Sequence, residues 1–451
     1  MPSSNKTPPL LTIPLELREA IYKELLSNSV NGPQLLRTCR EIYEEARKFL
    51  YQRPLIFSRR SALQEWLDVT PYDAQLYVAD LTIELQDVDL SPLLDQPDNL
   101  SKANPTRLQT WKLYDREERK LRELLLKFPN LRALTIRPIQ DQQSSLYQEF
   151  LRGFLKALGS IFPNLHDLCL EGNFHHQSLS FLVSLVRLQS FTFDGFSSST
   201  PQNTADIFSR LADLTNLSVK TQSFTEHAVR NMGRLSSFSL LEPTSPTNIP
   251  SLFFTTKLLA ALRDQSAFTS LTLVFSCAPD GQLIQALEGL LRSSSIAYLR
   301  LDWPSLDPSI MTQHDLLPSS LKEIWIRTAS MEMASNGLQT ILARQKAGNA
   351  SSLRRVVFIR KARDASDKGF ASGHLKDGGL QSESSSHGPE EASGDAREVL
   401  SMRKMSSGRV DRTVSGESYP VEAAKEETFA GLKRQLEGLH MIVAWHTETA
   451  P

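Results

Sequence analysis

The candidate functional residues of this 451-residue chain indicate binding rather than catalysis. His175 and His176 are adjacent, but no cysteine or acidic residue stands at the spacing that a metal site needs. The sequence contains no glycine-rich phosphate loop and no G-x-S-x-G nucleophile motif. We therefore expect no catalytic residue, no metal and no cofactor, and recognition of another protein becomes the leading class of function.

The strongest candidates for recognition lie late in the chain, where Trp325 stands between Glu323 and Arg327. The two-residue spacing places all three on one face of a strand. Tyrosine, tryptophan and arginine are the residues most enriched in binding hot spots. With similar residues on neighbouring segments they predict a surface that contacts a target protein: Tyr298, Arg300, Asp302, Glu323, Trp325, Arg327 and Arg355. The alternative is that the strand frame is wrong or that an inserted loop covers Trp325.

These candidates belong to a pattern that recurs along the chain and must position them. The pattern is L-x-x-L-x-L with bulky apolar substitutes, and nine copies start between Leu131 and Leu353 at intervals of 21 to 34 residues. An earlier copy is Val78-Leu81-Ile83. Segments with the apolar period of a helix lie between the copies, for example 147–158 and 282–293. A short strand followed by a helix therefore repeats through this part of the chain.

The repeated strand–helix unit predicts an α/β fold, a leucine-rich-repeat solenoid or horseshoe that spans 78–360 with an insertion at about 87–109. One unit cannot bury its own leucines, so neighbouring units stack and share a core. The alternative is a doubly wound α/β domain, whose strands are usually continuous apolar runs because both faces are covered. Here the alternate strand positions are polar, which favours a sheet with one exposed face.

The polar positions between the strand leucines predict the character of the exposed, concave face. Early copies are acidic, with Asp80, Asp167 and Asp194, whereas middle copies carry mostly serine and threonine and late copies contain arginine. The formal net charge of −1, from 50 basic and 51 acidic residues, therefore conceals regions of opposite character. A chain with so little net charge is not expected to bind nucleic acid through its overall electrostatics.

The composition changes after the repeats. Residues 361–422 are rich in serine and glycine and lack apolar periodicity, so we expect a disordered segment. A helical stretch and an apolar run then occupy 426–446, and Leu436-Leu439-Met441 fits the repeat pattern. We interpret 426–446 as a last, capping repeat.

The first part of the chain, residues 10–57, is expected to form a small helical domain of its own. Leu17, Ile21 and Leu25 recur every four residues along its first helix, and a second helix runs from Gln34 after a turn. So small a unit has little to bury its apolar faces against, which leaves apolar surface for a partner.

This region, with IPLELREAIYKELL at 13–26 and LLRTCREIYEEARKFLY at 35–51, resembles the F-box, in the L-P-x-E-L-R-x-x-I-Y variant that is abundant in fungal proteins. F-box proteins of ubiquitin ligases dock this unit on a Skp adaptor, which links to a cullin–RING core. The resemblance implies that six residues face the adaptor or shape that surface: Pro14, Leu17, Ile21, Leu25, Leu36 and Cys39. Many F-boxes have tryptophan three residues after this cysteine, whereas this chain has Ile42.

An F-box before leucine-rich repeats is a recurrent arrangement in substrate receptors. The resemblance therefore implies a non-catalytic substrate-recognition subunit of an SCF-type E3 ubiquitin ligase. The alternative is a scaffold or recognition protein outside any ligase, whose N-terminal helices only cap the solenoid. Cys39, Cys169 and Cys277 are too scattered for a disulfide framework, and no apolar run reaches the roughly 18 residues of a membrane span. We expect an intracellular protein, cytoplasmic and/or nuclear, with no membrane partner.

Overall fold

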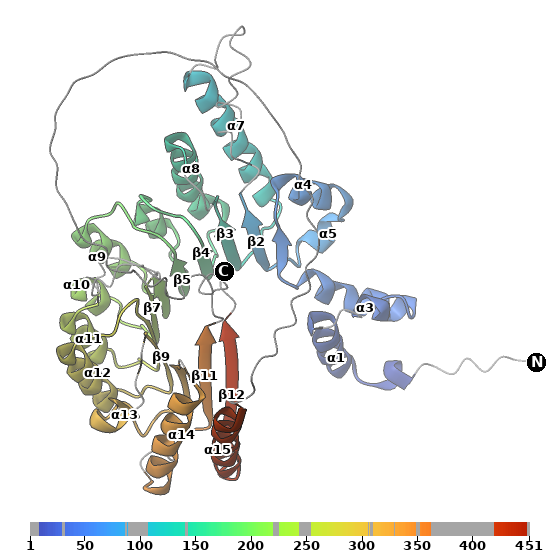
Figure 1. Ribbon diagram of the computed structural model, residues 1–451. Coiled ribbons are helices and arrows are strands. Elements are labelled where there is room, and N and C mark those ends of the chain that lie inside the picture. Colours follow the sequence, from blue (N-terminus) through green and yellow to red (C-terminus); the bar gives the residue numbers. More distant parts are fainter. Residues whose placement is uncertain are drawn as a thin grey trace, which may run out of the picture.

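The computed structural model describes residues 9–28, 32–85, 88, 107–139, 143–219, 225–242, 254–304, 306, 310–328, 330–348, 352–361 and 419–448. Their strands form one parallel sheet in which each strand pairs with the next in chain order (Figure 1). The strands are β1 (Leu55–Phe57), β2 (Asp80–Glu84), β3 (Ala133–Arg137), β4 (Asp167–Leu170), β5 (Ser190–Phe193), β6 (Asn216–Val219), β7 (Ser237–Leu241), β8 (Ser270–Val274), β9 (Tyr298–Asp302), β10 (Glu323–Arg327), β11 (Arg355–Lys361) and β12 (Ile442–Glu448). Sequential pairing of this kind is the topology of a solenoid, because each unit contacts only its neighbours.

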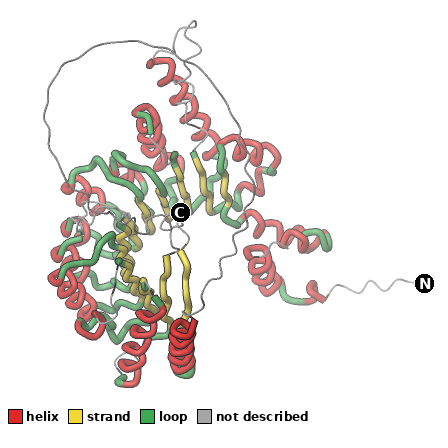
Figure 2. The backbone as a smooth tube through the Cα atoms, in the orientation of Figure 1, coloured by secondary structure: helices red, strands yellow, loops and turns green. Residues whose placement is uncertain are grey.

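Helices lie along the outer side of the curved sheet, while the strands line its inner side (Figure 2). A sheet with helices on one side is not doubly wound, so that alternative is wrong. The helices of the array are α4 (Arg60–Val69), α5 (Tyr72–Gln75), α7 (Arg107–Leu125), α8 (Ser145–Ile161), the 3-10 helix η4 (Leu179–Ser184), α9 (Pro201–Ser209), α10 (Glu226–Arg230), α11 (Thr256–Arg263), α12 (Gly281–Ser293), α13 (Ile310–Gln313), α14 (Met331–Lys346) and α15 (Tyr419–Glu437).

The strand leucines build the core as the repeat pattern predicts. Every apolar residue of the predicted triplets, from Val78 to Phe358, is buried and belongs to a single cluster. The residues between them are half-buried in β3, β5 and β10, so burial alternates with a period of two. The alternation arises because one face of the sheet packs against the helices and the other faces the concave side.

The array begins earlier than the predicted start at residue 78. β1, α4 and α5 precede that point, and β1 pairs in parallel with β2. The pattern missed this unit because Gln52 stands where the first apolar residue of the triplet is required. Most of the predicted insertion at 87–109 and of the predicted disordered segment at 361–422 lies outside the described residues.

The last repeat has a different frame from the predicted one. α15 begins at Tyr419, before the predicted start at 426, and β12 places Val443 and Trp445 at the positions of the strand leucines. The triplet Leu436-Leu439-Met441 is therefore wrong. Leu439 is 39% exposed, because the helix continues through Glu437 and leaves Leu439 in the turn before the strand.

The N-terminal helices form a separate unit. They are the 3-10 helix η1 (Pro9–Thr12), α1 (Leu15–Asn28), α2 (Gly32–Leu35) and α3 (Arg40–Tyr51), and they project from the end of the array that carries α5 (Figure 1). Their buried apolar residues make a cluster distinct from that of the array, namely Tyr22, Leu26, Ile42, Ala46 and Phe49. The unit therefore has its own small core.

Candidate functional site

Helix α1 has two apolar faces, one buried and one exposed. Tyr22 and Leu26 are fully buried in the core of the helical unit. Leu17, Ile21 and Leu25 stand four residues apart on the other face, with 57%, 36% and 44% of their surface exposed. Pro14, just before the helix, is exposed as well. We call these four residues, Pro14, Leu17, Ile21 and Leu25, the N-terminal stripe.

The other two predicted adaptor residues are less exposed than this stripe. Leu36 and Cys39 are half-buried and pack against the core of the helical unit. The predicted continuous helix from Gln34 is wrong, because α2 ends at Leu35 and α3 starts only after Cys39. Thr38 donates its hydroxyl hydrogen to the Leu35 carbonyl at 2.7 Å, which closes a turn between the two helices. Leu36 and Cys39 therefore shape the unit from inside.

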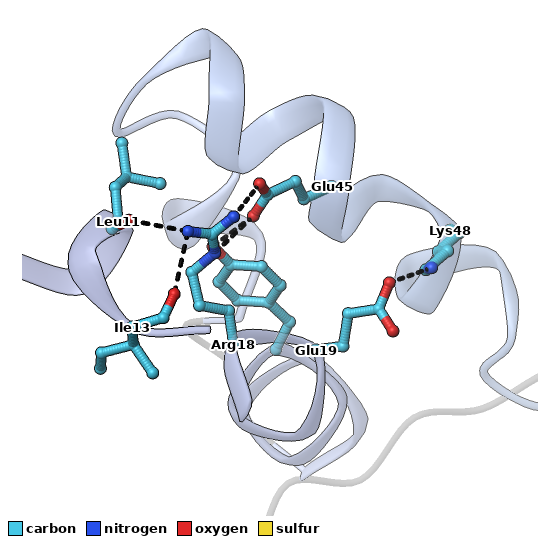
Figure 3. A network of polar contacts seen from close by, with 7 residues as sticks. Leu11, Ile13, Arg18, Glu19, Glu45 and Lys48 are labelled. Atoms are coloured by element: carbon cyan, nitrogen blue, oxygen red, sulfur yellow. Dashed lines mark hydrogen bonds and ion pairs between the residues drawn. The ribbon is translucent and has the colours of Figure 1, made fainter. Parts of the chain in front are cut away.

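A polar network holds α1 against α3 (Figure 3). Arg18 donates to the Glu45 carboxylate through Nε, at 3.0 Å, and through Nη2. Its Nη1 donates to the carbonyls of Leu11 and Ile13, at 2.8 and 3.1 Å. The Tyr22 hydroxyl donates to the same carboxylate at 3.0 Å. The network ties η1, α1 and α3 together behind the stripe.

This network was not predicted from the sequence, although Arg18 and Tyr22 occupy positions of the motif that resembles the F-box. Their four-residue spacing was a usable signal, since it places both on one helix face. Glu45 lies 27 residues from Arg18, and no periodicity connects them. Burial, and to a lesser degree the bond to Glu45, raises the pKa of Tyr22 to about 12, so the hydroxyl keeps its proton.

Among the described residues, an ion pair and a ring contact join the helical unit to the array. Arg47 of α3 forms an ion pair with Asp73 of α5 at 3.4 Å. Tyr51, the last residue of α3, meets Trp66 of α4 edge to face, with ring centroids 6.3 Å apart. These contacts orient the N-terminal stripe relative to the sheet.

The predicted target-binding residues gather on the concave face of three neighbouring strands. The register pairs Glu323 of β10 with Tyr298 of β9 and with Arg355 of β11, and it pairs Trp325 with Arg300. We call Tyr298, Arg300, Glu323, Trp325, Arg327 and Arg355 the late concave surface. Burial alternates along β10 as predicted, so the strand frame is correct and Trp325 lies on the concave face.

Trp325 is held in place on this surface. Its Nε1 donates to Glu323 Oε1 at 2.6 Å, and the Arg355 guanidinium lies over its ring, 5.7 Å from the centroid. The imidazole of His446 on β12 meets the ring edge to face at 5.6 Å. Beside the indole lies a hollow of about 180 Å³, which Tyr298 and Arg300 also line. A fixed aromatic ring beside a hollow suits the capture of a partner's side chain.

Asp302 departs from the prediction because its surface is fully buried. Its carboxylate accepts hydrogen bonds from Arg300 at 3.3 Å and from Arg327 at 3.2 Å. A buried carboxylate requires such partners, since an unpaired charge in the interior is costly. Asp302 therefore anchors two arginines of the late concave surface from below and does not itself face a target.

The early concave face is acidic, with one arginine between two glutamates. Arg137 of β3 donates to Glu171 at 2.8 Å and to Glu84 of β2 at 3.4 Å. Burial first, and then the Glu171 carboxylate, raises the pKa of Cys169 to about 12. The Cys169 thiol therefore stays protonated at neutral pH and is a poor nucleophile. Burial, followed by the nearby Asp167 carboxylate, raises the pKa of Asp80.

Neither a metal-binding group nor a membrane-spanning helix is found among the described residues. They contain no group of three histidine, cysteine or acidic side chains arranged to hold a metal ion. No helix among them combines the length and apolar character needed to cross a membrane.

Comparison with known proteins finds no matching family model and no matching curated protein. The solved structures that are similar over much of the chain include the following two. The Rad7–Elc1 complex of yeast contains a chain with 12% identity and a TM-score of 0.35, and the match covers 76% of this chain and 88% of that one. A leucine-rich-repeat protein of Leptospira interrogans has 15% identity and a TM-score of 0.25, with 67% and 82% covered. TM-scores this low do not establish a shared fold. The assignment of the architecture is therefore based on the strand order of the sheet itself.

Proposed function

We propose that this chain is the non-catalytic substrate-recognition subunit of an SCF-type E3 ubiquitin ligase, working in the cytoplasm and/or nucleus. In this role the N-terminal stripe binds a Skp adaptor, which links the chain to a cullin–RING core. The late concave surface binds a target protein. Holding both partners raises the effective concentration of the target near the ubiquitin-charged enzyme.

The observation that carries the proposal is the exposed aliphatic row of α1. Leu17, Ile21 and Leu25 face outward, although α1 already buries Tyr22 and Leu26 in a core of its own. A contiguous apolar surface on a helix held by a separate polar network supports docking of another protein. The row coincides with the face that the F-box resemblance assigns to the adaptor.

A cap that only seals the solenoid is the weaker alternative. Such a cap shares its buried residues with the first repeat, because sealing the core is its purpose. Here the helical unit and the array have separate apolar clusters. Contacts between the two units include the ion pair of Arg47 with Asp73 and the ring contact of Tyr51 with Trp66.

The test of adaptor binding is a pull-down of a purified Skp adaptor with the full chain. Replacing Leu17 and Ile21 by aspartate removes two apolar contacts worth about 1.5–3 kcal/mol each when fully buried, so we expect at least about 100-fold weaker binding. Val186→Asp is the matched control, because Val186 is an aliphatic residue of the array with 59% of its surface exposed. Circular dichroism checks that each variant is folded. A wild-type chain that retains no adaptor contradicts the proposal.

The test of target binding compares the proteins that co-purify with the wild-type chain and with a Trp325→Ala, Arg355→Ala variant. Both side chains lie on the exposed face of the sheet, so the fold should survive. Tyr72→Ala, on α5 and 65% exposed, is the control. Loss of the same co-purifying protein from the control and from the variant contradicts the assignment of the late concave surface.

A further inference from the structure

The C-terminal end of the array finishes in an unusually long pair of strands. β11 and β12 form a parallel ladder of seven residue pairs, from Arg355↔Ile442 to Lys361↔Glu448. β10 pairs only with the first five residues of β11. The last two residue pairs of the ladder therefore extend beyond the rest of the sheet.

The outer edge of β12 offers a regular set of backbone groups. Ile442 donates its N–H to the Arg354 carbonyl at 2.7 Å, toward β11. In a parallel pair, alternate residues direct both backbone groups to the same side. Val443, Trp445 and Thr447 therefore direct N–H and C=O away from β11, and the sheet formed by the described residues ends there. An edge of this kind is a template for another strand.

Three exposed side chains at this end are apolar. Ile442 is 61% exposed, and Leu439 and Trp445 are 39% and 37% exposed. Trp445 lies on the helix side of the sheet, against Phe358 and Phe429 at centroid distances of 5.5 and 5.4 Å. Terminal repeats of solenoids normally present a polar outer surface. Here part of the core side is left uncovered by the described residues.

We propose that a second copy of this chain covers the edge, with the two β12 strands antiparallel about a two-fold axis at Trp445. The three outward-facing residues are spaced symmetrically about Trp445, so this register satisfies all of them at once. Trp445 pairs with itself across the axis, and Val443 pairs with Thr447 of the second copy. A two-fold interface needs self-complementarity of this kind.

The charges of α15 fit the same arrangement. Glu426 and Glu427 lie in the described N-terminal part of α15, whereas Lys433, Arg434 and Glu437 lie toward its C-terminal end. Lys433 pairs with Glu437 at 3.8 Å, so the C-terminal end keeps one net positive charge, on Arg434. A two-fold axis through the neighbouring strands sets the two α15 helices antiparallel. The acidic part of each helix then lies toward the basic part of the other, which favours this occupant over a strand of unrelated sequence.

The register is tested with a double variant, Ala444→Cys and His446→Cys. In the proposed pairing position 444 lies opposite position 446 of the second copy, at a non-hydrogen-bonded pair with Cα atoms about 4.5 Å apart. That separation falls within the range of a disulfide, about 4.4–6.8 Å. Under mild oxidation we expect a cross-linked dimer on a non-reducing gel. Either single variant is the control, since it keeps Cys39, Cys169 and Cys277 but lacks the opposed pair.

The dimer itself is tested by light scattering of the full chain. We expect a mass of about twice 50.6 kDa at high concentration. Thr447→Pro removes an outward N–H and leaves the bonds to β11 intact, so it should weaken dimerisation at least tenfold. A wild-type monomer at about 100 µM overturns the proposal. So does a dimer that forms no cross-link and is unaffected by Thr447→Pro, because another face then associates. Slow exchange of the outward amides of Val443, Trp445 and Thr447 in a monomer also overturns it, since a different segment then covers the edge.

Discussion

Replacing Glu45 by glutamine should loosen the helical unit while the array stays intact. The Glu45 carboxylate accepts hydrogen bonds from Arg18 and Tyr22, and the two charged side chains are only 10% (Arg18) and 17% (Glu45) exposed. The substitution keeps the shape but removes the negative charge. Arg18 then remains charged and buried, and its acceptors are the carbonyls of Leu11 and Ile13 and the one uncharged amide oxygen of the substituted side chain.

The expected loss of stability arises because Arg18 stays buried without its ion-pair partner. Breaking a buried ion pair by removing one partner costs about 3–5 kcal/mol. The two carbonyl bonds keep part of the stabilisation, so we take the lower end, about 3 kcal/mol, which is roughly a 150-fold change in the opening equilibrium. The loss is local, because the helical unit has its own apolar cluster.

Amide hydrogen exchange measured by mass spectrometry separates the two parts of the chain. In the Glu45→Gln variant, amides of α1 and α3 should exchange roughly 150-fold faster, while those of β2 to β10 keep the wild-type rate. Glu44→Gln is the matched control, because Glu44 is 50% exposed and its ion pair with Arg47 at 3.4 Å lies at the surface, where such pairs contribute little to stability. Equal exchange in the two variants would refute the reasoning, because the buried network would then contribute no more than a surface pair.

Three further predictions concern single residues. Because the pKa of Tyr22 is raised in the folded state, the unfolded chain loses the Tyr22 hydroxyl proton at a lower pH than the folded chain does. The stability of the helical unit should therefore fall as pH rises from 10 to about 12. Tyr22→Phe should abolish this pH dependence of stability in exchange measurements. Because the folded state also raises the pKa of Asp80, the ionised form is disfavoured on folding; Asp80→Asn should raise the melting temperature at pH 7 and leave it unchanged well below pH 3.8. A Cβ at Gly195 would lie 2.6 Å from the backbone carbonyl carbon of Phe174, so Gly195→Ala should cost about 1–3 kcal/mol in urea unfolding.

The repeats were predictable because a simple physical rule creates them. A strand covered on one face alternates between buried and exposed residues, so Leu188, Phe191 and Phe193 could be assigned to the core from spacing alone. The rule failed where an apolar residue is missing, as at Gln52 before β1. It also failed where leucines near a helix end imitate the pattern, as at Leu436 in α15 and Leu439 in the turn that follows it.

The candidate surfaces were predictable only in part. The outward position of Leu17, Ile21 and Leu25 followed from a four-residue period and a resemblance. The burial of Asp302 did not, because it depends on two arginines from β9 and β10 that converge on one carboxylate. Spacing describes which face a side chain takes, but it does not describe which charges neutralise one another across strands.

The sequential strand order also means that the length of the array is proportional to its number of units. Neighbouring strands lie about 4.8 Å apart, so each strand–helix unit moves the late concave surface one fixed step away from the N-terminal stripe. Deleting or duplicating one middle unit should shift and rotate one surface relative to the other without altering a residue of either. The number of units therefore sets the distance between the two bound partners. That distance can change without any change in what each surface binds.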